Sequence, residues 1–277
     1  MCNISRNHLN SNIWNMVPIE ILAMKSIRGL GFLNKLPAGC ILLVLLLSSA
    51  VLAGSEEGRS KSLQAVFEKN GNIFLKVENN IVQLTKTGRD HAPLLSPDGK
   101  WVAFIREIEG KVKECSEDKD LWVCASDQLW SIDLATRAER MIVEPLEDTP
   151  DARKAIANIS NMTFSPDSKT LYFETQAWAV SGAIHAVDPD GKNERFVTDG
   201  DDLRVIKRSW IEKLTGHLVM HKHKYFMGGG AYDLFWLTTP TGKELGPLGE
   251  FEDMEYFTRG LKLEYMDNGF STREFSD

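Results

Sequence analysis

The sequence predicts an all-β fold, a β-propeller of about four four-stranded blades, because two patterns repeat along it. The turn "SPDGK", which begins at Ser96, recurs as "SPDSK" at Ser165, 69 residues later. A second pattern of strand, polar turn and strand occurs four times, with corresponding positions 56, 55 and 50 residues apart at Ile73, Leu129, Ile184 and Leu234. Repeats of this length built only from strands are typical of propellers, in which each small sheet stacks on its neighbours.

The repeated turn predicts a hairpin in each copy. Proline fixes φ, aspartate bonds back to the backbone, and glycine can take a positive φ. The strand after the first turn alternates, with Trp101, Ala103 and Ile105 on one face. The turn motif comprises Ser96, Pro97, Asp98, Gly99, Ser165, Pro166 and Asp167.

Each strand–turn–strand pattern is followed by a hairpin of this kind, expected at 92–106, 158–175, about 203–224 and about 251–266. The segment 62–69 resembles the second strand of such a hairpin, and Met254–Met266 is expected to supply the opposite half. One blade would then be assembled from both ends of the chain, without a bare edge strand. The repeats fit either a four-bladed ring or a shortened form of a larger, six-bladed propeller.

Two smaller expectations follow from the same reading. The polar connector 148–160 is expected to contain one helical turn. The aromatic residues at strand positions are expected to form the core between blades: Phe74, Phe104, Trp130, Phe164, Phe173, Phe235 and Phe257.

The N-terminal part is expected to be a targeting segment. Residues 1–23 look like an over-extended, disordered start, and 24–53 combines a cationic region with the apolar run 41–47 and small residues ending at Ala53. The apolar stretch 38–53 is shorter than the roughly 20 residues of a membrane-spanning helix, so we favour a cleaved signal peptide over an anchor. A linker (54–61), the propeller (62–266) and a C-terminal tail (267–277) would follow, in the periplasm or secreted.

Charge limits the class of partner. Without residues 1–53 the chain carries 28 basic and 38 acidic side chains, a net charge of −10. Nucleic acids and anionic lipid surfaces both require a basic face. The charge therefore argues against nucleic acid and an anionic lipid surface as partners. From the signal segment and the repeats we expect a monomer that binds an envelope protein or peptide, with no cofactor and no stable membrane insertion after signal cleavage.

Cys115 and Cys124 are the only cysteines after the signal segment, and they bracket "SEDKDLWV". In an oxidising compartment a pair this close predicts a disulfide, whereas half of a metal site would require further soft ligands. The stapled loop carries Trp122 among charges that include Asp118 and Asp120. Such a loop suits partner binding, because the staple lowers the entropy cost of docking; alternatively, Trp122 folds back over its own blade.

The stretch "HLVMHKHKYF" offers a candidate metal site. On a regular strand His217, His221 and His223 share one face, but His217 and His223 would lie about 20 Å apart. His221 and His223, about 6.6 Å apart, could hold zinc or copper with a carboxylate from a neighbouring strand. The alternative is a surface strand that is rich in histidine and lysine. The acidic turn "DGDD" (199–202) lacks the spacing of a calcium loop and is expected to be solvated.

The segments Gln83–Phe104 and Asn161–Phe173 resemble the TolB-like, or PD40, propeller repeat, and by spacing the resemblance covers most of 62–266. The resemblance implies an exported scaffold that docks envelope proteins. TolB proteins carry an α/β domain before the propeller, whereas these repeats start within about ten residues of the expected cleavage site, so the Tol–Pal role is not implied. Prolyl-oligopeptidase-type enzymes share such repeats, but Gly-x-Ser-x-Gly is absent from this sequence.

Two functions remain open from the sequence. The first is a non-catalytic, exported scaffold that binds a protein or peptide. The second is a metal-dependent hydrolase or lyase with its site at the central mouth of the propeller.

Overall fold

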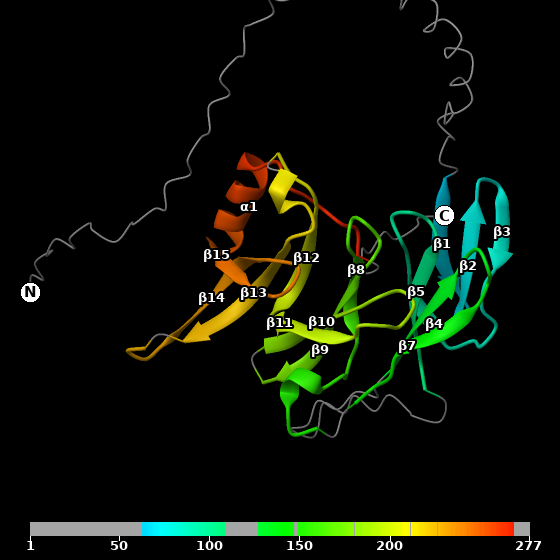
Figure 1. The fold of residues 1–277 in the computed structure, drawn as a ribbon, viewed down its shortest axis with the longest axis horizontal. Coiled ribbons are helices and arrows are strands. Elements are labelled where there is room, and N and C mark those ends of the chain that lie inside the picture. The colour runs from blue at the N-terminus through cyan, green and yellow to red at the C-terminus, as the bar shows by residue number, and fades with distance from the viewer. Residues whose placement is uncertain are drawn as a thin grey trace, which may run out of the picture. The chain divides into compact units, whose positions relative to one another are not determined.

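The structure is a computed structural model that describes residues 63–108, 127–146, 149–179, 181–210, 212–225 and 227–268. Four antiparallel sheets follow one another in chain order (Figure 1). The first sheet contains β1 (Gln64–Lys69), β2 (Asn72–Val77) and β3 (Asn80–Gln83); the second contains β4 (Asp90–Leu95), β5 (Trp101–Arg106), β6 (Gln128–Asp133) and β7 (Glu139–Val143).

The third sheet contains β8 (Ser160–Phe164), β9 (Leu171–Trp178), β10 (Ser181–Val187) and β11 (Arg195–Asp199). The fourth contains β12 (Asp201–Arg208), β13 (Leu218–Tyr225), β14 (Ala231–Thr238), β15 (Glu244–Gly249) and the short β16 (Glu264–Tyr265). Apart from β16, strands that are consecutive in sequence pair within each sheet, as in the blades of a propeller. The predicted all-β fold class is confirmed.

The repeated turn has the same geometry in both copies. In the first, the Ser96 hydroxyl donates to Asp98 Oδ1 at 2.7 Å; in the second, Ser165 donates to Asp167 Oδ1 at 2.7 Å. The left-handed position is taken by Gly99 (φ +73°) and by Ser168 (φ +63°). The Ser168 hydroxyl also accepts a hydrogen bond from the Asp98 N–H at 3.0 Å, so the turns of the second and third sheets are joined.

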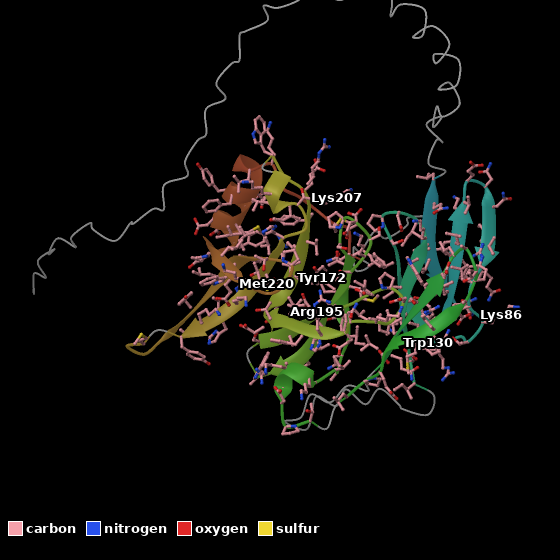
Figure 2. All side chains as sticks on the ribbon, in the orientation of Figure 1. Lys86, Trp130, Tyr172, Arg195, Lys207 and Met220 are labelled. Atoms are coloured by element: carbon pink, nitrogen blue, oxygen red, sulfur yellow. The ribbon has the colours of Figure 1, made fainter. Side chains whose placement is uncertain are left out.

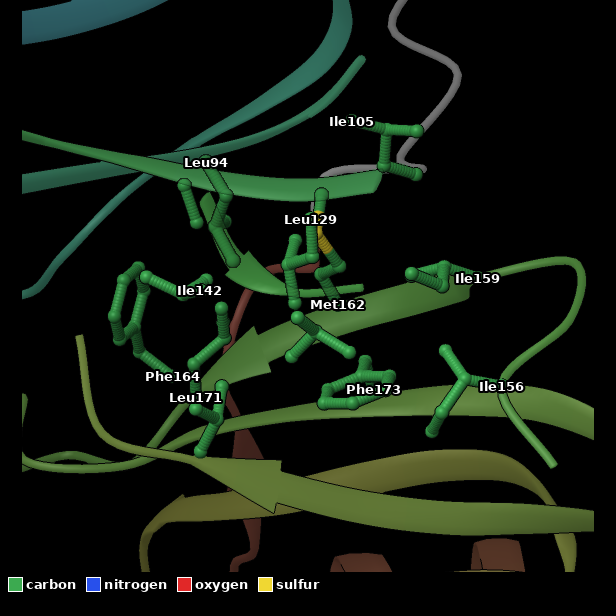
Figure 3. Packing of buried hydrophobic residues seen from close by; sticks show 13 residues of the cluster. Leu94, Ile105, Leu129, Ile142, Ile156, Ile159, Met162, Phe164, Leu171 and Phe173 are labelled. Atoms are coloured by element: carbon green, nitrogen blue, oxygen red, sulfur yellow. The ribbon is translucent and has the colours of Figure 1, made fainter. Parts of the chain in front are cut away.

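Hydrophobic clusters fill the space between consecutive sheets. The largest lies between the second and third sheets and includes Leu129, Ile142, Met162, Phe164 and Phe173 (Figure 3). A second cluster joins the third sheet to the fourth through residues such as Tyr172 and Met220, both labelled in Figure 2. A third joins the first and second sheets. Each sheet therefore buries a face on the next one, which is how repeated units gain stability.

Most of the aromatic residues expected in the core are buried or partly buried there. Phe104, Phe164, Phe173 and Phe235 are buried, and the half-buried Phe74 stacks on Phe67 of the same sheet at 5.4 Å. The expectation for Phe257 is wrong, because this residue is 41% exposed on a helix.

The predicted hairpin at 251–266 is also wrong, because the helix α1 (Phe251–Gly260) forms there. The Glu250 N–H donates to Asp253 Oδ2 at 3.3 Å, and Glu255 pairs with Arg259 one turn later at 2.6 Å. Both are helix-stabilising interactions. Met254 of α1 packs against one face of the fourth sheet, and the third sheet packs against the other face. The helix therefore covers the face on which a further blade would stack.

The two ends of the described chain do not share a sheet, contrary to the prediction. β16 pairs with β12 at one edge of the fourth sheet, whereas β1 pairs with β2 in the first. Two 3-10 turns lie in connectors, η1 (Ala152–Lys154) and η2 (Glu212–Leu214), and η1 is the helical turn expected in 148–160. Among the described residues, α1 and the other helical segments are too short to cross a membrane.

Gly242 provides a test of the packing between the third and fourth sheets. It has φ +89° in the β14–β15 turn, and a Cβ at this position would overlap the Val197 carbonyl of β11. Gly242→Ala is expected to cost about 2 kcal/mol, because strain at positive φ is added to the overlap. Urea denaturation measures the change.

Gly216→Ala is the matched control. Gly216 also has a positive φ, +83°, but its Cβ would meet no atom within 4 Å. The control should lose about 1 kcal/mol or less, the backbone contribution alone. Equal losses in the two variants would contradict the close approach of β11 to the β14–β15 turn.

Candidate functional site

Two carboxylates face each other across the seam between the third and fourth sheets. Glu174 lies on β9 with its side chain on the same face as Tyr172, toward the fourth sheet, and Asp201 begins β12 on the face turned toward the third. Both line a cavity of about 480 Å³ together with Trp178, Ser160, Gln176 and others. Glu174 also lines an adjacent cavity of about 350 Å³ beside Asp202 and Asn268. We call the pair of cavities the inner-edge site, because β8 is an edge strand of the third sheet and β12 lies next to the edge strand β16 of the fourth.

The hydrogen bonds of the inner-edge site hold one oxygen of each carboxylate. Glu174 Oε1 accepts from the Asn161 side-chain amide and from the Leu203 N–H, both at 2.5 Å. Asp201 Oδ1 accepts from the Gly182 N–H at 2.9 Å. A Cβ at Gly182 would lie 2.7 Å from that oxygen and 3.0 Å from the Thr175 carbonyl oxygen, so a larger residue would disturb this contact. No lysine or arginine of the described residues forms an ion pair with either carboxylate.

Burial raises the pKa of both groups. For Glu174 burial outweighs the two hydrogen bonds that favour the charged form, and the nearby charges of Asp201 and Asp202 raise the pKa further. The pKa of Asp201 is raised by burial and by Asp202, while the Gly182 N–H and the nearby His221 oppose the shift. A desolvated carboxylate without a cation is a group whose charge a basic ligand would stabilise.

Irregularities in the strands create the space for these groups. Glu174 lies opposite Ser160, where the register of β8 on β9 shifts before Thr163. A similar shift between Asp201 and Arg204 interrupts the pairing of β12 with β13. Bulges of this kind are common beside functional sites because they redirect side chains.

The expected metal pair does not assemble into a metal site. His221 and His223 lie on one face of β13, as predicted, but the His221 ring packs edge-on to Phe235 and His223 Nδ1 lies 2.7 Å from Asp233 Oδ1. No group of three or more histidine, cysteine, aspartate or glutamate side chains that could hold a metal occurs within the described ranges. The acidic turn 199–202 is not simply solvated, since Asp199 contacts the Lys222 ammonium at 3.1 Å.

The other predicted contacts are untested. Cys115, Cys124, Trp122, Asp118 and Asp120 lie outside the described residues, as does the proposed signal segment. The disulfide and the partner-binding loop therefore stay predictions. The residues of the turn motif are placed as the hairpin prediction requires.

Sequence reasoning did not single out Glu174. The only signal for it is one acidic residue in the apolar strand "LYFETQAW". Its neighbours at the site, Asn161, Leu203 and Asn268, come from distant segments, and the Asn268 side chain reaches the site by donating to Asn161 Oδ1.

No family model and no curated protein matches the sequence. Solved structures similar to the chain include TolB from Acinetobacter baumannii, with 16% identity and a TM-score of 0.39 over 69% of this chain and 41% of that one. Dipeptidyl peptidase 4 from Porphyromonas gingivalis has 17% identity and a TM-score of 0.45 over 68% and 31%. The β-propeller domain of the Trilobed protease from Pyrococcus furiosus has 17% identity and a TM-score of 0.39 over 65% and 48%. The chain spans less than half the length of each.

The structure contains four consecutive antiparallel sheets. In the second and third sheets, the Ser-Pro-Asp turn joins the first two strands. These features identify the fold. The chain has a β-propeller fold. Propeller folds serve many functions, so the fold alone does not determine the function of this chain.

Proposed function

We propose that this protein is an exported, non-catalytic TolB-like β-propeller that binds a protein or peptide partner in the cell envelope. The observation that supports the proposal is the inner-edge site, where Glu174 and Asp201 line one cavity and form no ion pair with a lysine or arginine of the described residues. A lysine or arginine side chain of the partner would supply the missing charge. The Trp178 indole, which is 38% exposed in the same cavity, offers such a cation an aromatic face.

The location of the site favours a partner segment over a small ion. The two cavities adjoin at Glu174, and together they extend from Trp178 to Asn268. An extended peptide could place a basic side chain between the carboxylates while its backbone meets the amides and hydroxyls along β8 and β12. The loop with Trp122, Asp118 and Asp120, with the disulfide that we propose between Cys115 and Cys124, is a second proposed contact for the same partner.

The variant Glu174→Gln/Asp201→Asn tests the proposal. Both replacements keep the oxygen that accepts the backbone and amide hydrogen bonds and remove only the charge. The immobilised protein is incubated with envelope extract, and bound proteins are quantified by mass spectrometry. We expect the double variant to recover at least about tenfold less of the partner, because a desolvated ion pair is lost. Adding 0.5 M salt to the wild type should reduce recovery less than the double substitution does, because a buried pair is weakly screened.

Glu252→Gln/Glu255→Gln is the matched control, because it removes two charges from exposed positions on α1. It should bind the partner like the wild type. The double variant at the inner-edge site should also be slightly more stable at pH 7. A carboxyl group whose pKa is raised in the folded state costs stability as pH rises through that pKa. The glutamine and asparagine that replace Glu174 and Asp201 do not ionise, so the variant avoids this cost. Equal recovery by the double variant and the control would refute the proposal.

A further inference from the structure

A separate cavity of about 700 Å³ lies between the outer strands of the second and third sheets. We call it the seam cavity. Its apolar walls come from β7, β11 and the connector between the sheets: Ile142, Val143, Leu146, Ile156 and Phe196. Ile142 and Ile156, both labelled in Figure 3, also belong to the hydrophobic core between the second and third sheets, so the cavity borders this core. The volume is in the range of pockets for small organic ligands.

His185 of β10, whose side chain is 1% exposed, lines the cavity beside these apolar residues; the charged residues Glu144, Asp151, Arg153, Lys154 and Glu194 line it as well. The His185 ring is stacked on Phe173 (5.5 Å between centroids) and edge-on to Phe196 (5.9 Å). Nδ1 lies 3.0 Å from Glu194 Oε1. Nε2 is buried and has no hydrogen-bond partner within the described part of the chain.

The Glu194 contact determines what Nε2 can bind. A carboxylate only accepts hydrogen bonds, so Nδ1 carries the proton and donates it to Glu194. In the neutral ring Nε2 then has a free lone pair, and a second proton there would leave an N–H unpaired in apolar surroundings. A buried acceptor without a donor costs free energy, which a ligand donor would recover.

We infer that the seam cavity binds an aromatic alcohol whose hydroxyl donates a hydrogen bond to His185 Nε2. The phenol group combines an apolar ring, which suits these walls, with a single donor at one end. Either a tyrosine side chain of a peptide or a free phenolic molecule could supply it. The seam cavity is distinct from the inner-edge site, so this inference does not depend on the proposed function.

Titration of the full protein with 4-ethylphenol and with ethylbenzene tests the inference. We expect 4-ethylphenol to bind at least about fivefold more tightly, the effect of one net hydrogen bond. In the wild type, only 4-ethylphenol should shift the ¹⁵N resonance of His185 Nε2, and this readout requires no variant. N-acetyltyrosine amide distinguishes the sources: binding by this compound as well indicates a peptide, and binding by 4-ethylphenol alone indicates a small molecule.

His185→Phe keeps the aromatic stacking and removes the lone pair, so its preference for 4-ethylphenol should disappear. The matched control is His223→Phe, which removes an imidazole on β13 of the fourth sheet. That variant should keep the wild-type preference. The inference is overturned if neither compound binds the wild type, if ethylbenzene binds equally well, or if the Nε2 resonance does not shift.

Discussion

Replacing Phe164 by alanine is expected to destabilise the protein by about 3–5 kcal/mol, as for other buried phenylalanines. The Phe164 side chain is 1% exposed and lies in the core between the second and third sheets, in a cluster with Leu94 and Leu129. Its removal would leave a cavity that the strands of two sheets cannot both move to fill. Urea denaturation followed by far-ultraviolet circular dichroism measures the loss.

Tyr256→Ala is the control for this substitution. Tyr256 is 76% exposed on α1, so the loss of its ring should change stability by less than about 0.5 kcal/mol. If Phe164→Ala were no more destabilising than Tyr256→Ala, the contact between the second and third sheets would not be part of the folded protein.

Replacing Lys222 by methionine is expected to cost about 3 kcal/mol, near the lower end for breaking a buried ion pair. The ammonium of this fully buried lysine on β13 donates to Thr198 Oγ1 at 2.6 Å and to Asp199 Oδ1 at 3.1 Å on β11. It also donates to Glu244 Oε1 at 3.0 Å on β15. The network therefore ties the third sheet to the fourth. The two carboxylates are about a third exposed, and solvent reduces the loss.

The effect of Lys222→Met should depend on pH. The Lys222 ammonium counteracts burial and holds the pKa of Asp199 below its usual 3.8, and Lys224 and Lys222 together lower that of Glu244 below 4.5. Carboxylates with lowered pKa stabilise the folded state above their unfolded pKa, and this stability is lost as pH falls through the folded values. The difference between wild type and variant should therefore shrink below pH 4.5.

The control is Lys192→Met, which breaks the exposed pair with Asp190. Surface pairs contribute little, so this variant should unfold like the wild type at every pH. A constant difference between Lys222→Met and wild type from pH 7 to pH 3 would contradict the role given to the Lys222 network.

The part of the fold that local patterns determine was predictable from the sequence. The turns at Ser96 and Ser165 depend on short-range chemistry, and strand alternation placed Ala103 and Phe104 on opposite buried faces. The repeats at Ile73, Leu129, Ile184 and Leu234 each fall in the corresponding strand of a sheet.

The errors came from treating the last repeat as a copy of the first. The segment from Glu250 to Arg259 contains two helix signals: an acid at each end of a capping box, and an i,i+4 ion pair. These local signals favour a helix more strongly than the position of the segment in the repeat favours a strand. The candidate site was harder to predict, because Glu174 acquires its environment from a segment that begins at Asp201. Burial of one carboxylate near another is a tertiary property that alternation in a single strand does not show.

The most direct test is whether each sheet contacts the next in solution. In protein with labelled isoleucine, leucine, valine and methionine methyl groups, nuclear Overhauser cross-peaks should connect Leu129 and Ile142 of the second sheet with Met162 and Leu171 of the third, and Ile184 of the third with Leu203 of the fourth. Cross-peaks of this kind between consecutive sheets are the predicted result. A spectrum with methyl cross-peaks only within individual sheets would contradict the stacked-blade fold and the inner-edge site that depends on it.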